Sequence, residues 1–98
     1  MTTENKPAPL DFARVEALRK HMLMTASDMS SIFGVSRVTY YNWTRGKKLR
    51  GTSEARVRGA VKKMLHIIRD HDWPSPEVLS MSQPERKNAL VELINQYE

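Results

Sequence analysis

Residues 25–46, TASDMSSIFGVSRVTYYNWTRG, contain two short segments with the residue spacing of a helix, separated by a glycine. In the first segment, apolar side chains are three or four residues apart, as in an amphipathic helix. This helix is predicted to end at Gly34, because glycine readily adopts the left-handed conformation in which many helices terminate. Ser36 follows two residues later and predicts the N-cap of a second short helix over 37–44. Two helices joined by so short a turn predict a helix-turn-helix.

The remainder of the chain also follows helical periodicity. Cap residues precede apolar stripes and predict helices over about 12–22, 25–33 and 52–70, a short turn over 75–79 and a last helix after Ser82. The long helix is expected to bury one stripe, made of Val57, Ala60, Val61, Met64, Leu65 and Ile68. No segment alternates over enough residues for a strand. The sequence therefore predicts an all-α, compact bundle of about five helices.

The aromatic residues of the 37–44 helix are predicted to divide between core and surface. Tyr40 and Trp43 are three residues apart and share the inward face, so we expect them in the core, whereas Tyr41 points outward. Stacking on unpaired bases would instead require the rings of Tyr40 and Trp43 to be exposed together. The sequence favours the core interpretation.

Positive charge is concentrated in the middle of the chain. Residues 29–69 carry ten Lys and Arg against one acid, Glu54, whereas residues 1–28 are balanced and residues 70–98 have an excess of acids. A basic middle third indicates a polyanionic partner. A solvated helix face is the alternative, which the scarcity of acids among these cations disfavours.

Several function classes find no support in the sequence. The chain has no cysteine, which excludes disulfides, thiolate zinc sites and cysteine nucleophiles, and suits a reducing cytoplasm. No apolar run is long enough to span a membrane. His21, His66 and His71 have no metal-ligand spacing, and no carboxylate pair is placed for acid–base work. We therefore expect a non-enzymatic protein without metal or cofactor.

The stretch LRKHMLMTASDMSSIFGVSRVTYYNWTRGKK resembles the lambda-repressor-like (Cro-type) helix-turn-helix family of bacterial and phage regulators. FGVSRVTYYNWTRGK is its most specific part, and the resemblance covers about residues 15 to 69. It implies a protein that binds double-stranded DNA sequence-specifically, with helix 37–44 in the major groove. It also implies a phage or bacterial transcription regulator, for instance a repressor, in the cytoplasm of a bacterial cell or a phage-infected bacterium.

The resemblance assigns roles to single residues. It places four residues where the family reads base edges: Arg37, Val38, Thr39 and Asn42. Exposed Tyr41 lies beside them, and the cap residue Ser36 belongs to the same surface. The cations after Trp43 are expected to contact phosphates: Arg45, Lys47, Lys48 and Arg50. Two residues outside the helix complete the candidate DNA-binding set: Thr25, at a helix start, and Arg19.

Three positions depart from the family pattern. Ala26 stands where the family often has glutamine, and Leu23 replaces a helix-ending glycine. Thr44 stands where a glutamate often pairs with the arginine of the first helix. Arg19 is therefore expected to lack an ion-pair partner and to be free for phosphate.

The chain is predicted to have three parts. Residues 1–10 form a flexible leader, 11–72 the DNA-binding domain, and 73–98 a helical extension that packs on that domain or forms a homodimer. Two other functions remain open at this point. One is a DNA-recognition accessory subunit of a transposase or packaging enzyme, and the other is a protein-interaction module that binds the transcription machinery.

Overall fold

The computed structural model describes residues 10–97. Within them the chain forms six helices: α1 (Phe12–His21), α2 (Ala26–Phe33), α3 (Arg37–Thr44), α4 (Gly51–His71), α5 (Pro76–Leu79) and α6 (Gln83–Gln96). This part of the chain has no strand, so the all-α prediction is confirmed. The helices number six rather than about five because the expected turn over 75–79 forms the one-turn helix α5.

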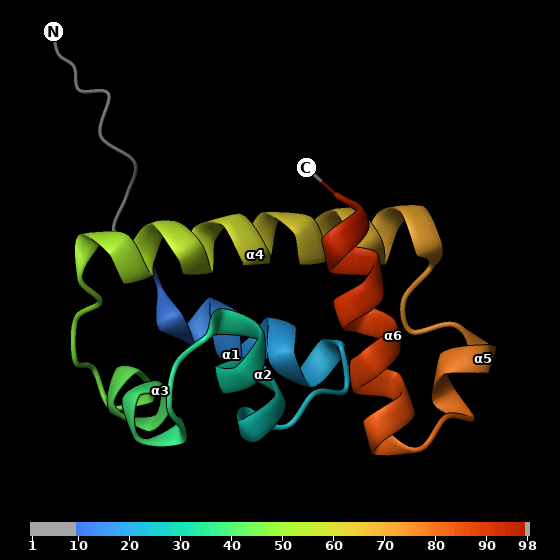
Figure 1. Ribbon diagram of the computed structural model, residues 1–98, viewed down its shortest axis with the longest axis horizontal. Helices are drawn as coiled ribbons and strands as arrows, with labels where there is room; N and C mark the ends of the chain where they lie inside the picture. The colour runs from blue at the N-terminus through green and yellow to red at the C-terminus, as the bar shows by residue number, and fades with distance from the viewer. Residues whose placement is uncertain (1–9, 98) are drawn as a thin grey trace, which may run out of the picture.

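The long helix α4 extends along one side of the molecule, and the shorter helices lie to one side of it (Figure 1). α2 packs against both α3 and α4, and α1 packs against α3. α6 crosses the C-terminal half of α4, with α5 at that end of the molecule (Figure 1). The three helices α1–α3 therefore occupy one end of the bundle, and α5 and α6 occupy the other.

Five of the six predicted helix caps are confirmed, and the one expected at Thr52 or Ser53 is wrong. In five helices, a side-chain oxygen of the cap residue accepts a hydrogen bond from a backbone amide of the first turn. These cap residues are Asp11, Thr25, Ser36, Ser75 and Ser82. Each cap satisfies an amide that has no partner inside its helix. Gly34 ends α2 in the left-handed conformation with φ 72°, as the sequence predicts. These local signals fix the boundaries of the two helices on which the site depends.

One hydrophobic core unites the bundle. Its buried side chains include Val15, Met29, Phe33, Tyr40, Trp43, Val57, Met64, Ile67, Trp73, Val78 and Leu90. The core does not divide at residue 72, because three of these residues belong to the segment predicted as an extension. That segment also bonds to the turn after α1: Trp73 Nε1 donates to the Met22 carbonyl at 2.9 Å, and Gln83 Nε2 donates to the Leu23 carbonyl at 2.9 Å. Residues 73–97 thus pack on the rest of the molecule.

Helix α4 differs from its prediction in start and in buried face. It begins at Gly51, ahead of Thr52 and Ser53, because the Glu54 amide already bonds to the Arg50 carbonyl at 2.7 Å. Leu65 was expected in the core but is 54% exposed, whereas Ile67 is fully buried. The buried face is rotated toward Ile67, which joins the common core, and α6 packs against this half of α4 (Figure 1).

The leader prediction is testable only at its last residue. Leu10 packs against the hydrophobic core, contrary to its assignment to a flexible segment. Residues 1–9 lie outside the described part of the chain.

Candidate nucleic-acid interface

Helix α3 presents two different faces. Tyr40 has no exposed surface and Trp43 is 5% exposed, so both rings belong to the core as predicted. The Tyr40 ring lies edge-on to Phe12 of α1 with centroids 5.2 Å apart, and Phe12 makes a similar contact with Trp43 at 5.8 Å. The stacking-platform alternative is wrong, because neither ring is open to a base. α3 is anchored by these aromatic residues, and its other face is free.

The free face holds most of the residues predicted to read bases. Arg37, Val38 and Tyr41 are exposed, and Tyr41 keeps 43% of its surface. Thr39 and Asn42 are partly buried on the side of α3 that turns toward the following loop. Ser36 is exposed at the start of the helix, where its Oγ accepts the Thr39 amide hydrogen bond at 3.1 Å. The structure thus brings the six predicted residues of 36–42 to one surface, on which Ser36, Arg37, Val38 and Tyr41 are exposed.

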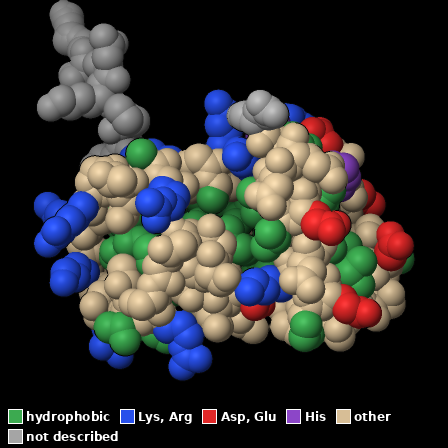
Figure 2. Space-filling view, viewed as in Figure 1, with side chains coloured by type: hydrophobic (Ala, Val, Ile, Leu, Met, Phe, Trp, Pro, Cys, Tyr) green, Lys and Arg blue, Asp and Glu red, His purple; other side chains and the backbone are tan. Residues whose placement is uncertain are grey.

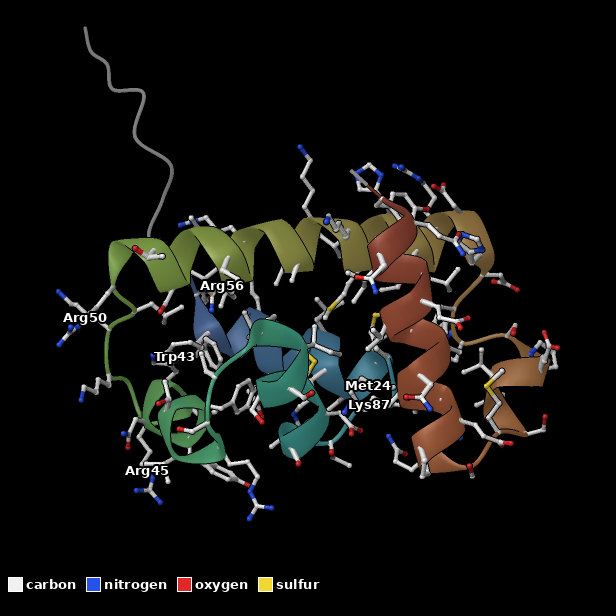
Figure 3. The ribbon with its side chains drawn as sticks, viewed as in Figure 1. Met24, Trp43, Arg45, Arg50, Arg56 and Lys87 are labelled. Carbon is white, nitrogen blue, oxygen red and sulfur yellow. The ribbon has the colours of Figure 1, made fainter. Side chains whose placement is uncertain are left out.

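A basic loop adjoins this face. Lys47, Lys48 and Arg50 line a hollow of about 200 Å³ together with Thr39, Asn42, Trp43 and Ser53. Arg45 and Arg50 extend outward at the same end of the molecule, while Trp43 points inward (Figure 3). All four predicted phosphate contacts are exposed. The base-reading candidates and the cations therefore form one continuous surface, which we call the α3 surface (residues 36–50).

The charge on the molecule is strongly polarised. Lys and Arg side chains lie over α3, the loop after it and α4, whereas most Asp and Glu side chains in this view lie toward the opposite end, around α5 and α6 (Figure 2). The same division occurs along the sequence, where residues 70–98 carry six acids against Arg86 and Lys87. The molecule therefore has a more positive end and a more negative end.

The expectation that Arg19 lacks a partner is wrong. Its guanidinium makes two hydrogen bonds with the Glu16 carboxylate, Nε to Oε2 at 3.1 Å and Nη2 to Oε1 at 3.0 Å. Nη1 donates to the Met24 carbonyl at 3.1 Å. Because Glu16 stabilises the positive charge, the pKa of Arg19 is raised above its ordinary value. Arg19 acts first as a link within the fold, although its place in the predicted DNA-binding set stays a prediction.

The sequence reasoning missed Glu16, which ties α3 to α1. Its carboxylate also accepts a hydrogen bond from the Tyr40 hydroxyl. Burial alone would raise the pKa of Glu16, but the hydrogen bonds from Arg19 and Tyr40 outweigh burial and lower it. For Tyr40, burial and the bond to Glu16 both raise the pKa of the phenol. The i,i+3 spacing of opposite charges at positions 16 and 19 was the available signal.

Thr25 forms a complete capping box at the start of α2. Its hydroxyl accepts the Asp28 amide at 3.0 Å, and the Asp28 carboxylate accepts the Thr25 amide at 3.0 Å. Gln83 Nε2 donates to the same carboxylate at 2.8 Å. The predicted phosphate site at this helix start therefore already contains an acidic side chain.

Other kinds of site find no support in residues 10–97. No three His, Cys, Asp or Glu side chains in this range are grouped to hold a metal ion. None of the helices described here is long and apolar enough to span a membrane. Neither the family models, nor the curated proteins, nor the solved structures compared with the chain gave a match. The α3 surface is therefore the candidate functional site of the described residues.

Proposed function

We propose that the protein binds double-stranded DNA sequence-specifically, with α2 and α3 acting as a helix-turn-helix and α3 entering the major groove. The carrying observation is the division of α3 into a buried aromatic face and an exposed face with cations beside it. A major groove about 12 Å wide admits one α-helix. The α3 surface offers a helix of that width with polar and basic side chains outward.

The positions of the cations on the α3 surface suit two roles, base reading and phosphate binding. Arg37 is exposed at the first position of α3, where a guanidinium is able to bond guanine O6 and N7 together. The loop cations that follow suit phosphate oxygens, which position a protein without reading sequence. The other end of the molecule, where residues 70–97 carry five acids against Arg86 and Lys87, is repelled by the same phosphates, so it favours one orientation on DNA.

The resemblance to lambda-repressor-like regulators makes a phage or bacterial transcription regulator the proposed role, in the cytoplasm of a bacterial cell. A homodimer would place two copies of α3 in successive major grooves, about 34 Å apart. Trp73, Val78 and Leu90 are buried in the protein's own core. A homodimer formed through residues 73–98 would therefore have to use the exposed side chains of that segment.

Selection of bound duplexes from a random pool tests this proposal. We expect one enriched motif, and a palindromic motif would support the dimer. Arg37→Ala should then weaken binding to the selected duplex much more than to a random duplex. Arg14→Ala, which removes an exposed arginine from α1, is the matched control and should not change this ratio. Failure to bind any duplex at low salt would refute the proposal.

A further inference from the structure

The α3 surface includes two exposed apolar side chains among its polar and basic ones, Val38 and Tyr41. With about 3.6 residues per turn, Val38 projects from the side of α3 opposite Tyr40 and Trp43. Val38 is 70% exposed, a high value for a large hydrophobic side chain. Tyr41 lies one turn further along and is also exposed, so the two side chains form an apolar strip. A strip of this kind inside a basic surface calls for an apolar group on the partner.

Thr39 is not placed to make the same apolar contact as Val38. Its amide donates to Ser36 Oγ at 3.1 Å, and its Oγ1 accepts the Ser36 hydroxyl at 3.0 Å. It is partly buried and lines the hollow next to Lys47 and Lys48. Thr39 therefore stabilises the start of α3, and its surroundings differ from those of Val38, although the resemblance places both among the base-reading candidates.

Resting on the proposed function, we infer that Val38 is a specificity-determining residue that recognises the 5-methyl group of a pyrimidine in the major groove. The thymine methyl is the apolar group that unmodified DNA offers there. A valine in a helix has essentially one χ1 rotamer, so its methyl groups are already fixed before DNA binds. The exposed Tyr41 ring would flank this contact, and the exposed Arg37 would be placed to bond a polar group of a neighbouring base.

The same methyl group has two chemical sources. It occurs in thymine and in 5-methylcytosine, and Val38 would contact either one. The position of the adjacent polar side chains decides between them, because the two bases present different hydrogen-bonding groups.

Deoxyuridine substitution tests the inference on the duplex chosen by selection. Replacing thymines one at a time by deoxyuridine removes only the methyl group. We expect about a fourfold loss of affinity at one or two thymines, the loss of one buried methyl contact. Val38→Ala should lose a similar factor on the original duplex and become insensitive at those thymines. Thr39→Ser, which removes a methyl but keeps the hydroxyl, should remain sensitive.

Methylating cytosines at C5 in the same duplex is the second arm. A gain for the wild type that Val38→Ala lacks identifies 5-methylcytosine as the source. Selective binding in which Val38→Ala stays as sensitive to deoxyuridine as the wild type would overturn the inference and leave the proposed function standing. Insensitivity of the wild type to both base changes would do the same. Absence of any selected duplex would overturn both.

Discussion

The hydroxyl of Tyr40 on α3 donates a hydrogen bond to the carboxylate of Glu16 on α1. Arg19 binds the same carboxylate through two nitrogens and reaches the Met24 carbonyl just before α2. One partly buried network thus links α1, α3 and the turn that leads into α2. Because charge-assisted hydrogen bonds are directional, this network fixes how α3 is held against the bundle.

Tyr40→Phe is expected to destabilise the protein by about 1–2 kcal/mol, because it removes one hydrogen bond to a charged group and leaves the ring in place. Urea unfolding measures the change. Tyr41→Phe is the matched control, since Tyr41 is exposed, and it should change the free energy of unfolding by less than about 0.5 kcal/mol. Equal effects of the two substitutions would contradict a structural role for the bond to Glu16.

Glu16→Gln is expected to flatten the acid dependence of stability. The pKa of Glu16 lies below its ordinary value of 4.5, since hydrogen bonds from Arg19 and Tyr40 outweigh the opposing effect of burial. Ionised Glu16 therefore stabilises the fold above pH 4.5, and this contribution is lost as the pH falls through the folded-state pKa. Unfolding free energies measured from about pH 6 down to about pH 3 should fall less steeply for Glu16→Gln than for the wild type.

Comparing the wild type with Glu16→Gln removes the contribution of the other acidic residues to the pH dependence of stability. The pKa of Asp70 is lowered by hydrogen bonds from Tyr97 and Arg69, and that of Glu85 by bonds from Ser82. Both residues are present in the wild type and the variant, so their effect appears in both curves. Parallel curves would mean that Glu16 does not gain from ionisation in the fold.

Gly34 and Gly59 are expected to respond to alanine in opposite directions. Gly34 has φ 72°, and an added Cβ would lie 3.3 Å from Arg56 Nη1, so Gly34→Ala should cost about 1–2 kcal/mol. Gly59 lies inside α4, and an added Cβ meets nothing within 4 Å. Gly59→Ala should therefore stabilise the protein by about 0.5–1 kcal/mol. Thermal unfolding of both variants checks the signs, and a stabilising Gly34→Ala would contradict the structure.

The helix boundaries near the site were predictable because their signals are local. Thr25 and Ser36 each bond an amide three residues ahead, so a cap and its partner lie together in the sequence. The inward direction of Tyr40 and Trp43 follows equally from their spacing on one helix.

Features that depend on distant partners were not predictable in this way. Leu65 and Ile67 are both apolar, and which of them is buried depends on which face of α4 the other helices cover. Arg19 was assigned no partner because a family pattern was followed, although Glu16 lies one turn away. The division of roles between Val38 and Thr39 depends on exposure, which the order of residues does not encode.

Trp73→Phe is expected to destabilise the protein, because Trp73 bonds the C-terminal segment to the rest of the fold. The Trp73 Nε1 donates to the Met22 carbonyl at 2.9 Å, and both residues are buried. Phenylalanine keeps an aromatic ring but leaves that carbonyl unpaired, at a cost of about 1–3 kcal/mol. Urea unfolding measures this cost. A loss under about 0.5 kcal/mol would mean that the bond contributes little to the packing of 73–97.

Lys47 and Lys62 provide a matched pair for the proposed phosphate contacts. Both are exposed lysines, but Lys47 lies in the basic loop after α3 and Lys62 on α4. Neutralising one phosphate contact reduces the slope of log affinity against log salt by about 0.9, so Lys47→Ala should weaken binding to every duplex alike and lower the slope by that amount. Lys62→Ala removes the same charge and should leave the slope near the wild-type value. Fluorescence anisotropy titrations over a range of salt concentrations measure both slopes. Equal changes would mean that net charge, rather than contact by the α3 surface, governs the attraction to DNA.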